Sequence, residues 1–367
     1  MRALTTLVAI TAAYAPPAQA RQSASAAEVV IDTIVIVTGN VFTDDEARSN
    51  AGFRFSNAIH FTTRPGVVRR ELLFEAGEVY DSAVVAETER NLRRLGIFRD
   101  VLIDSVRVEG RLVLVVQTFD SWSTQLTLNG RTTGNTFTWV VGVSERNFLG
   151  TGNPVSVSYR KDPDRNAFTA ATRINRLLNS NITTSGYYEN LSDGRRGGWL
   201  AGFPFRSFSD RKALEVSGER GDHRVLQFRT PLETQNVVEF QRRSFLNRIA
   251  GAYAPIAETG RYLRVGTWVQ VKREEILLQS DRALAIPDTV TGAVGVFAEY
   301  RRANFKVVTH FNGFALREDL DLSTVLFAST WVAPSAFGYE RTGLGPAILA
   351  STGIVVMVVA FRVAGRS

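Results

Sequence analysis

Few residues in this chain have the type and spacing that catalysis or metal binding requires. The 367 residues include no cysteine, and the three histidines, His60, His223 and His310, show no paired metal-ligand spacing. Neither a Gly-x-Ser-x-Gly nucleophile elbow nor a Gly-x-x-x-x-Gly-Lys phosphate loop occurs. We therefore expect no catalytic residues, no cofactor and no metal. An esterase or phospholipase whose serine and histidine lie far apart in sequence stays open as the enzymatic alternative.

The charged residues favour solvated or structural roles. The carboxylates of Asp162, Asp164 and the 281–288 stretch lie in loop-like sequence, where such groups are usually solvated. The formal net charge is +7, but the arginines occur as isolated pairs, such as Arg69-Arg70 and Arg242-Arg243, and not as one basic stripe. We therefore predict no nucleic-acid partner.

The first twenty residues predict a secretion signal. Arg2 supplies a positive start, an apolar stretch runs from Ala3 to Tyr14, and Ala18-Gln19-Ala20 offers a small-x-small cleavage site. We interpret residues 21–28 as a polar linker. After it, no stretch reaches the roughly 18 apolar residues that a membrane-spanning helix needs. An exported chain with these features is periplasmic, secreted or an outer-membrane β-barrel.

Residues 29–119 have the pattern of a small α+β domain. The β-branched run 30–37 predicts a strand, and a loop is expected through Asp44, Asp45 and Asn50. One helix is expected to begin near Pro65, and a second to begin at the cap Asp81-Ser82. Alternating residues from 100 to 106 and an apolar run over 111–119 predict two further strands. The expected order is β-α-α-β-β.

Three motifs make this unit resemble the polypeptide-transport-associated (POTRA) domain. They are Gly39-Asn40 after the first strand, ELLFEAGEVYD at 71–81, and ERNLRRLGIF at 89–98. We interpret the motif residues as structural: Gly77 and Gly96 end helices where the chain needs positive φ, and Leu92, Leu95 and Phe98 are expected in the core.

The POTRA resemblance implies a binding role for this unit, not a catalytic one. It implies docking of unfolded chains or partner subunits by strand addition to an exposed sheet edge. We expect that edge along the first strand of the closing pair, which comprises Asp100, Val101, Leu102, Ile103, Asp104 and Ser105.

From residue 120 to residue 367, apolar and polar residues alternate with a period of two. In 154–160, Val155, Val157 and Tyr159 alternate with polar residues, and 261–272 and 304–312 alternate in the same way. The alternation is weaker over 166–175, 197–205 and 224–232. One apolar face and one charged face predict membrane strands around a wet lumen, and a soluble β-sandwich stays open as the alternative.

A motif near the start of this second unit carries another resemblance. The segment GVSERNFLGTGN at 142–153, with Asn147, Phe148, Gly150, Thr151 and Gly152, resembles the barrel-start hairpin of the BamA/TamA outer-membrane assembly superfamily. Its glycines suit a tight turn between strands.

Two departures from that superfamily affect the expected barrel. The resemblance implies sixteen strands and an arginine-glycine-aromatic tripeptide, but no such tripeptide follows Asp120, and the chain ends at 361–367 without a terminal aromatic residue. At about 9–11 residues a strand, residues 120–367 hold about twelve to fourteen strands. Because an open sheet edge cannot sit in lipid, either the barrel closes with fewer strands or the chain is incomplete, and of the two we expect a partial barrel, truncated at the C-terminus.

Together these features predict an α+β POTRA domain in the periplasm followed by an all-β antiparallel transmembrane barrel in the bacterial outer membrane. The resemblance implies non-enzymatic insertion or translocation of polypeptides. The implied partners are unfolded outer-membrane or secreted polypeptides, outer-membrane lipids and periplasmic accessory subunits. A dedicated two-partner-type secretion pore and a passive porin or structural barrel are the alternatives.

Overall fold

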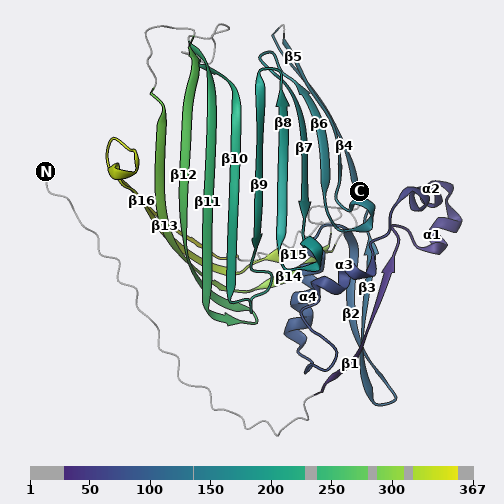
Figure 1. The fold of residues 1–367 in the computed structure, drawn as a ribbon. Coiled ribbons are helices and arrows are strands. Elements are labelled where there is room, and N and C mark those ends of the chain that lie inside the picture. Colours follow the sequence, from purple (N-terminus) through teal and green to yellow (C-terminus); the bar gives the residue numbers. More distant parts are fainter. Residues whose placement is uncertain (1–28, 135, 228–237, 280–286, 310–316, 354–367) are drawn as a thin grey trace, which may run out of the picture.

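The computed structural model describes residues 29–134, 136–227, 238–279, 287–309 and 317–353. Within these ranges a small α/β unit is followed by a long antiparallel sheet (Figure 1). The expected signal segment 1–20, the linker 21–28 and the terminal residues 354–367 lie outside the described residues. Among the described residues, no helix combines the length and apolar character needed to cross a membrane.

The N-terminal unit is a three-stranded sheet with helices on one side. Strand β2 pairs antiparallel with β3, and β1 pairs parallel with β3, so the sheet order is β1-β3-β2. Its elements in chain order are β1 (Ile31–Gly39), α1 (Asp44–Ser49), α2 (Ala51–Ile59), α3 (Pro65–Glu71), α4 (Ser82–Arg94), β2 (Phe98–Val108) and β3 (Arg111–Asp120).

The core of this unit lies between the sheet and helices α3 and α4. Alternate residues of β3, Leu112, Leu114 and Val116, are buried against Val68 of α3 and Leu92 of α4. The period of two in β3 and the helical spacing in α4 bring these side chains to one interface, where burial of apolar surface stabilises the unit.

The loop expected through Asp44, Asp45 and Asn50 is wrong, because helices α1 and α2 form there. Thr43 and Glu46 make a reciprocal capping box that starts α1, and the side chain of Asn50 accepts a hydrogen bond from the Gly52 N–H at 2.8 Å to start α2. Neither helix has a buried residue. The observed order is therefore β-α-α-α-α-β-β.

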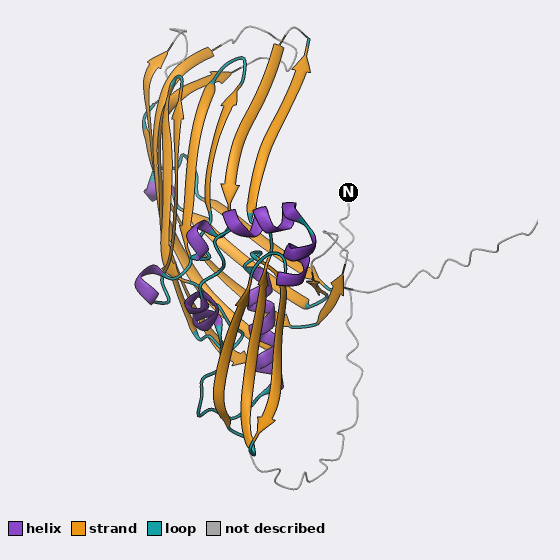
Figure 2. Cartoon of the chain, turned by 90° about the vertical axis from the view of Figure 1, so that its right-hand side faces the viewer, coloured by secondary structure: helices purple, strands orange, loops and turns teal. Residues whose placement is uncertain are grey.

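Within the described residues, the main feature of the second unit is one twelve-stranded antiparallel sheet. The sheet is curved, but its end strands β4 and β17 do not pair with each other in the described residues, so it is open (Figure 2). Its strands are β4 (Thr124–Thr133), β5 (Thr136–Glu145), β6 (Val155–Lys161), β7 (Asn166–Ile174), β8 (Thr183–Leu191), β9 (Gly194–Phe203), β10 (Lys212–Gln227), β11 (Val238–Glu258), β12 (Arg261–Gln279), β13 (Thr289–Arg302), β16 (Thr324–Ala333) and β17 (Gly343–Ser351).

The strand register gives this sheet one apolar face and one polar face. Val143 lies opposite Leu126 on one side and Val157 on the other, whereas the adjacent row pairs Ser144 with Gln125 and Ser156. The Leu126 side chain is 82% exposed. On β12, Val265, Val269 and Val271 are also exposed, as their alternation with polar residues predicted.

Strands β14 (Phe305–Thr309) and β15 (Arg317–Asp321) pair only with each other among the described residues. The stretch 304–312 was expected to be a strand of the barrel, and this expectation is wrong. Instead it begins an inserted hairpin between β13 and β16, at the end of the sheet that faces the N-terminal unit (Figure 1). Residues 310–312 of that stretch lie outside the described residues.

Candidate functional site

The expected binding segment 100–105 lies in β2, an edge strand of the N-terminal sheet. The N–H of Val101 donates to the Asp100 carboxylate at 3.0 Å, and the N–H of Ile103 donates to Glu89 of α4, also at 3.0 Å. Because neither amide bonds to β3, both face away from the sheet. Side-chain carboxylates therefore occupy the positions where the carbonyls of an added strand would bind.

The side chains of this edge segment differ in their environments. Val101 is fully buried in the core, and Leu102 and Ile103 are half-buried. Asp104 and Ser105 are exposed. The segment is therefore buried at its Val101 end and exposed to solvent at its Ser105 end.

The other edge of the sheet, β1, is partly covered by the chain itself. Ile31 exchanges backbone hydrogen bonds with the loop after α3: its N–H donates to Glu78 at 2.9 Å, and its carbonyl accepts from Gly77 at 2.8 Å. The N–H of Tyr80 donates to Val29 at 2.8 Å. Strand addition near the start of β1 would have to displace these backbone bonds, whereas addition to β2 displaces only side chains.

The inserted hairpin contacts the same region of the N-terminal unit. The Arg93 guanidinium on α4 donates two hydrogen bonds to Asp319 of β15, at 2.7 and 2.9 Å, and also contacts Glu89 at 3.3 Å. Arg317 of β15 lies 3.6 Å from Asp100. Both carboxylates that occupy the edge amides are therefore linked to the hairpin through charged contacts.

The barrel-start motif forms the turn between β5 and β6 and docks on the N-terminal unit. Asn147 is buried: its amide nitrogen donates to Thr63 at 2.8 Å, and its amide oxygen accepts from the Gly152 N–H at 2.8 Å. The Gly150 carbonyl accepts from the Arg64 N–H at 3.0 Å.

The glycines of this turn allow a close approach as well as a tight turn. Gly150 and Gly152 both have a φ of +70°. A Cβ on Gly150 would overlap the Thr62 carbonyl oxygen, and one on Gly152 would come within 2.8 Å of Val67. The exposed Phe148 and the neighbouring Thr151 complete the motif, and the Thr151 hydroxyl donates to the Phe148 carbonyl at 2.7 Å.

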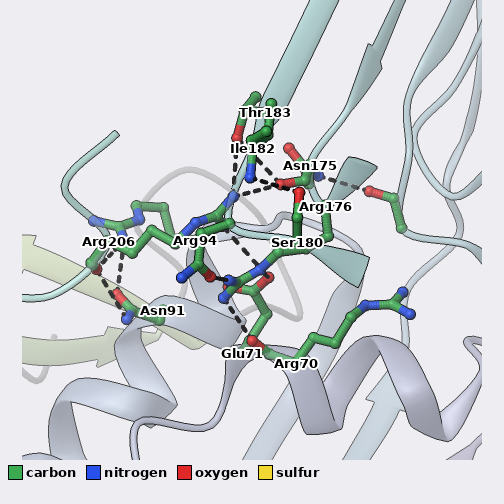
Figure 3. A network of polar contacts seen from close by, with 12 residues as sticks. Arg70, Glu71, Asn91, Arg94, Asn175, Arg176, Ser180, Ile182, Thr183 and Arg206 are labelled. Carbon is green, nitrogen blue, oxygen red and sulfur yellow. Dashed lines mark hydrogen bonds and ion pairs between the residues drawn. The ribbon is translucent and has the colours of Figure 1, made fainter. Parts of the chain in front are cut away.

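The turn between β7 and β8 docks on the end of helix α3 (Figure 3). Arg176 donates to the Glu71 carboxylate at 3.0 Å and to the Arg70 carbonyl at 2.5 Å. Arg70 in turn donates to Asn179 at 2.8 Å. Glu71 is buried, so Arg176 of this turn compensates its charge in place of solvent.

The turn between β9 and β10 docks on helix α4. The side-chain amide of Asn91 donates to the Arg206 carbonyl at 3.2 Å (Figure 3), and the Phe208 N–H donates to Glu87 at 2.7 Å. Burial raises the pKa of the Glu87 carboxyl, and the Phe208 N–H partly opposes that shift. Burial lowers the pKa of Arg206, and the nearby charge of Arg176 acts in the same direction.

The POTRA-like motif residues occupy structural positions. Gly39 ends β1 against the ring of Phe119, and the Asn40 side chain donates to the Asn57 carbonyl of α2 at 3.4 Å. Gly77 and Gly96 have φ values of +95° and +67°. Gly96 follows the end of α4, but α3 already ends at Glu71, so the expectation that Gly77 ends a helix is wrong and this glycine lies in a later turn. Leu92 and Phe98 are buried, and Leu95 packs against the same core.

The histidines do not form a metal centre in the described residues. The Nε2 atom of His60 lies 2.9 Å from the buried Asp120 carboxylate, which also accepts from the Thr63 N–H at 2.7 Å. His223 lies on β10, and His310 falls outside the described residues. Across the described ranges, no group of three or more acidic, histidine or cysteine side chains could hold a metal ion.

The sequence predicted a binding edge at 100–105 and a turn at 142–153, but not the residues that these segments contact. Glu89, which reaches the Ile103 amide, lies within the quoted 89–98 motif but carries no signal there for an edge contact. Thr63, which receives the Asn147 hydrogen bond, is 84 residues away in sequence. Contacts at such separations leave no periodic or local pattern.

No protein-family model matches the chain. The chain is 26% identical over 139 residues to the outer membrane protein assembly factor BamA of Neorickettsia risticii (strain Illinois), which covers 37% of this chain and 19% of that protein. The match thus spans about a fifth of the length of this curated relative. It confirms the predicted resemblance to the outer-membrane assembly superfamily.

Two solved structures align over most of the chain. BamA from Haemophilus ducreyi lacking POTRA domains 1–3 aligns with 8% identity and a TM-score of 0.41, covering 90% of this chain and 82% of that one. CdiB from Acinetobacter baumannii aligns with 11% identity and a TM-score of 0.34, covering 89% and 54%.

Proposed function

We propose that this chain inserts or exports polypeptides at the bacterial outer membrane, without enzymatic chemistry. The N-terminal unit acts as a POTRA domain in the periplasm, and the twelve-stranded sheet is embedded in the membrane. The observation that carries the proposal is the β2 edge, whose outward amides are held by replaceable carboxylates directly beside the junction with the sheet. The similarity to BamA supports the same role.

Capture of a substrate strand at β2 is an exchange of hydrogen bonds. Carbonyls of the incoming strand replace Asp100 at the Val101 amide and Glu89 at the Ile103 amide. Each exchange changes the free energy little, because one hydrogen bond replaces another and the released carboxylate is hydrated again. Affinity therefore comes from the additional backbone bonds and from side-chain contacts along the strand.

The two faces of the large sheet suit a membrane position. The row containing Leu126, Val143 and Val157 faces lipid, and the polar row containing Ser144 and Ser156 faces a wet interior. In the described residues β4 and β17 are the end strands of the sheet, and their outer backbone groups can pair with further strands. Such pairing is needed in a membrane, because an unpaired edge cannot remain in lipid.

The test is a proline substitution that removes one outward amide without removing a core side chain. Val101 is buried, so its replacement would disturb folding. Ser105 is exposed, and its amide points away from β3 as the amides of Val101 and Ile103 do. We expect Ser105→Pro to abolish cross-linking of an unfolded outer-membrane polypeptide to β2. The matched control, Arg107→Pro, changes an amide of the same parity nearer the hairpin turn and should leave capture unchanged.

A functional assay separates the remaining alternatives. The reconstituted chain should accelerate folding of a separate outer-membrane barrel into liposomes, and Ser105→Pro should remove that acceleration. Acceleration of only one dedicated partner would indicate a secretion pore. A defined single-channel conductance without any acceleration would indicate a porin and would overturn the proposed function.

A further inference from the structure

A group of exposed apolar side chains lies where the N-terminal unit meets the large sheet. We call it the apolar collar; it comprises Phe55 and Ile59 of α2, Phe61, Trp122 and Phe148. Phe55 is 65% exposed and Phe61 is 60% exposed. Large apolar side chains gathered in this way on a protein surface mark a contact with another apolar surface.

Side-chain contacts with Phe42 hold helix α2 in the orientation that exposes these residues. The Asn57 side chain donates to the Phe42 carbonyl at 2.8 Å and accepts from the Phe42 N–H at 3.1 Å. The rings of Phe42 and Phe53 stack with their centroids 4.0 Å apart. Polar and aromatic contacts therefore fix one side of the helix, and Phe55 and Ile59, one helical turn apart, remain outside that packing.

The collar is continuous with the apolar face of the large sheet. Ile59, Phe61 and Trp122 line one cavity of about 490 Å³ together with Val143 and Val157. These two valines belong to the exposed apolar row of β5 and β6. Polar residues such as Ser123, Thr124 and Glu145 also line this cavity, but its apolar side chains join the row to the collar in one surface.

The position and composition of the collar match a membrane interface. Figure 1 shows α1 and α2 projecting sideways from the N-terminal unit next to the base of β4. Trp122 lies at the base of the sheet, where aromatic residues are favoured at the boundary between lipid and water. Arg54 of α2 and Arg64, the residue before α3, are both exposed and can contact lipid phosphates.

We infer that the apolar collar inserts into the periplasmic leaflet of the outer membrane, so that α2 lies in the plane of the interface. The inference rests on the proposed membrane position of the sheet. The collar thereby fixes the depth and tilt of the N-terminal unit and holds the β2 edge at a set distance from the bilayer.

The cysteine-free chain permits a direct test with single cysteines. Phe55→Cys and Phe61→Cys probe the collar, and Leu126→Cys on the apolar face of β4 reports membrane embedding. Val108→Cys, at the β2–β3 turn, is the matched control because Val108 is also exposed and apolar but lies outside the collar. Each full-length variant carries an environment-sensitive dye in vesicles of phosphatidylethanolamine and phosphatidylglycerol.

Quenching by nitroxide lipids and by aqueous iodide gives the readout. We expect lipid quenching at positions 55, 61 and 126 to exceed that at position 108 several-fold, with the reverse order for iodide. Lipid quenching at position 126 but not at positions 55 and 61 would overturn the proposed insertion of the collar and leave the proposed membrane position of the sheet standing. Absence of lipid quenching at 126 overturns both. Circular dichroism checks folding, and Ile59→Cys replaces a collar variant that does not fold.

Discussion

Substitution of Gly150 by alanine tests the junction between the two units most directly. Gly150 lies in the β5–β6 turn with a φ of +70°, and an added Cβ would overlap the Thr62 carbonyl oxygen. Holding alanine at this φ costs about 1–2 kcal/mol whether or not the units are docked, so that cost cancels in the docking equilibrium.

The loss of docking free energy comes from two other effects. The overlap with Thr62 forces a backbone shift, which costs about 1–3 kcal/mol in a well-packed contact. The shift also weakens the 3.0 Å hydrogen bond from the Arg64 N–H to the Gly150 carbonyl, which contributes about 1 kcal/mol. The expected loss is therefore about 2–4 kcal/mol.

Amide hydrogen exchange over residues 61–67 measures this loss. Because about 1.4 kcal/mol corresponds to a factor of ten, exchange of this segment should accelerate roughly 30-fold to several hundredfold in Gly150→Ala. Gly77→Ala is the matched control: Gly77 also has a positive φ, +95°, but open space surrounds the position of its Cβ. Equal acceleration in both variants would refute the close-approach argument.

Two further predictions concern helix α4. Asp319→Asn removes one charge from the nearly buried pair with Arg93, whose hydrogen bonds of 2.7 and 2.9 Å should be worth about 1.5–3 kcal/mol. Tryptic cleavage at Lys306 should therefore rise roughly tenfold to a hundredfold, and unchanged cleavage would show that the pair does not hold the hairpin. The pKa of Glu87 is raised in the docked state, so the protonated carboxyl stabilises docking. This stabilisation is fully present below pH 4.5 and is lost as the pH rises through the docked-state pKa. Glu87→Gln keeps an acceptor for the Phe208 N–H but cannot titrate. The protection of that amide against hydrogen exchange should therefore no longer change with pH. A pH dependence that persists in this variant would show that another group titrates.

The short-range pattern of the sequence determined most elements of the N-terminal unit. Strands β2 and β3 and helices α3 and α4 follow from alternation, from Pro65 at the first position of α3 and from the Asp81 cap, because these signals act within one or two turns of the chain. The same kind of signal was present for α1 in the capping box of Thr43 and Glu46, so this helix could have been predicted.

The period of two likewise determined the two faces of the large sheet. Alternation depends only on the pleat of each strand, so residues such as Val155 and Val157 could be assigned to a common face before any pairing was known. It could not assign the strand beginning at Phe305 to a separate hairpin, because pairing partners depend on register between distant segments.

Only the tertiary structure decided how the candidate site is arranged. The sequence placed Asn147 and Gly150 in a turn, but the buried contacts with Thr63 and Thr62 arise because two units pack together. The occupation of the Ile103 amide by Glu89 depends in the same way on how α4 lies across β2. Local propensity and periodicity act along the chain, whereas these contacts join segments whose proximity is fixed by the packing of the whole fold.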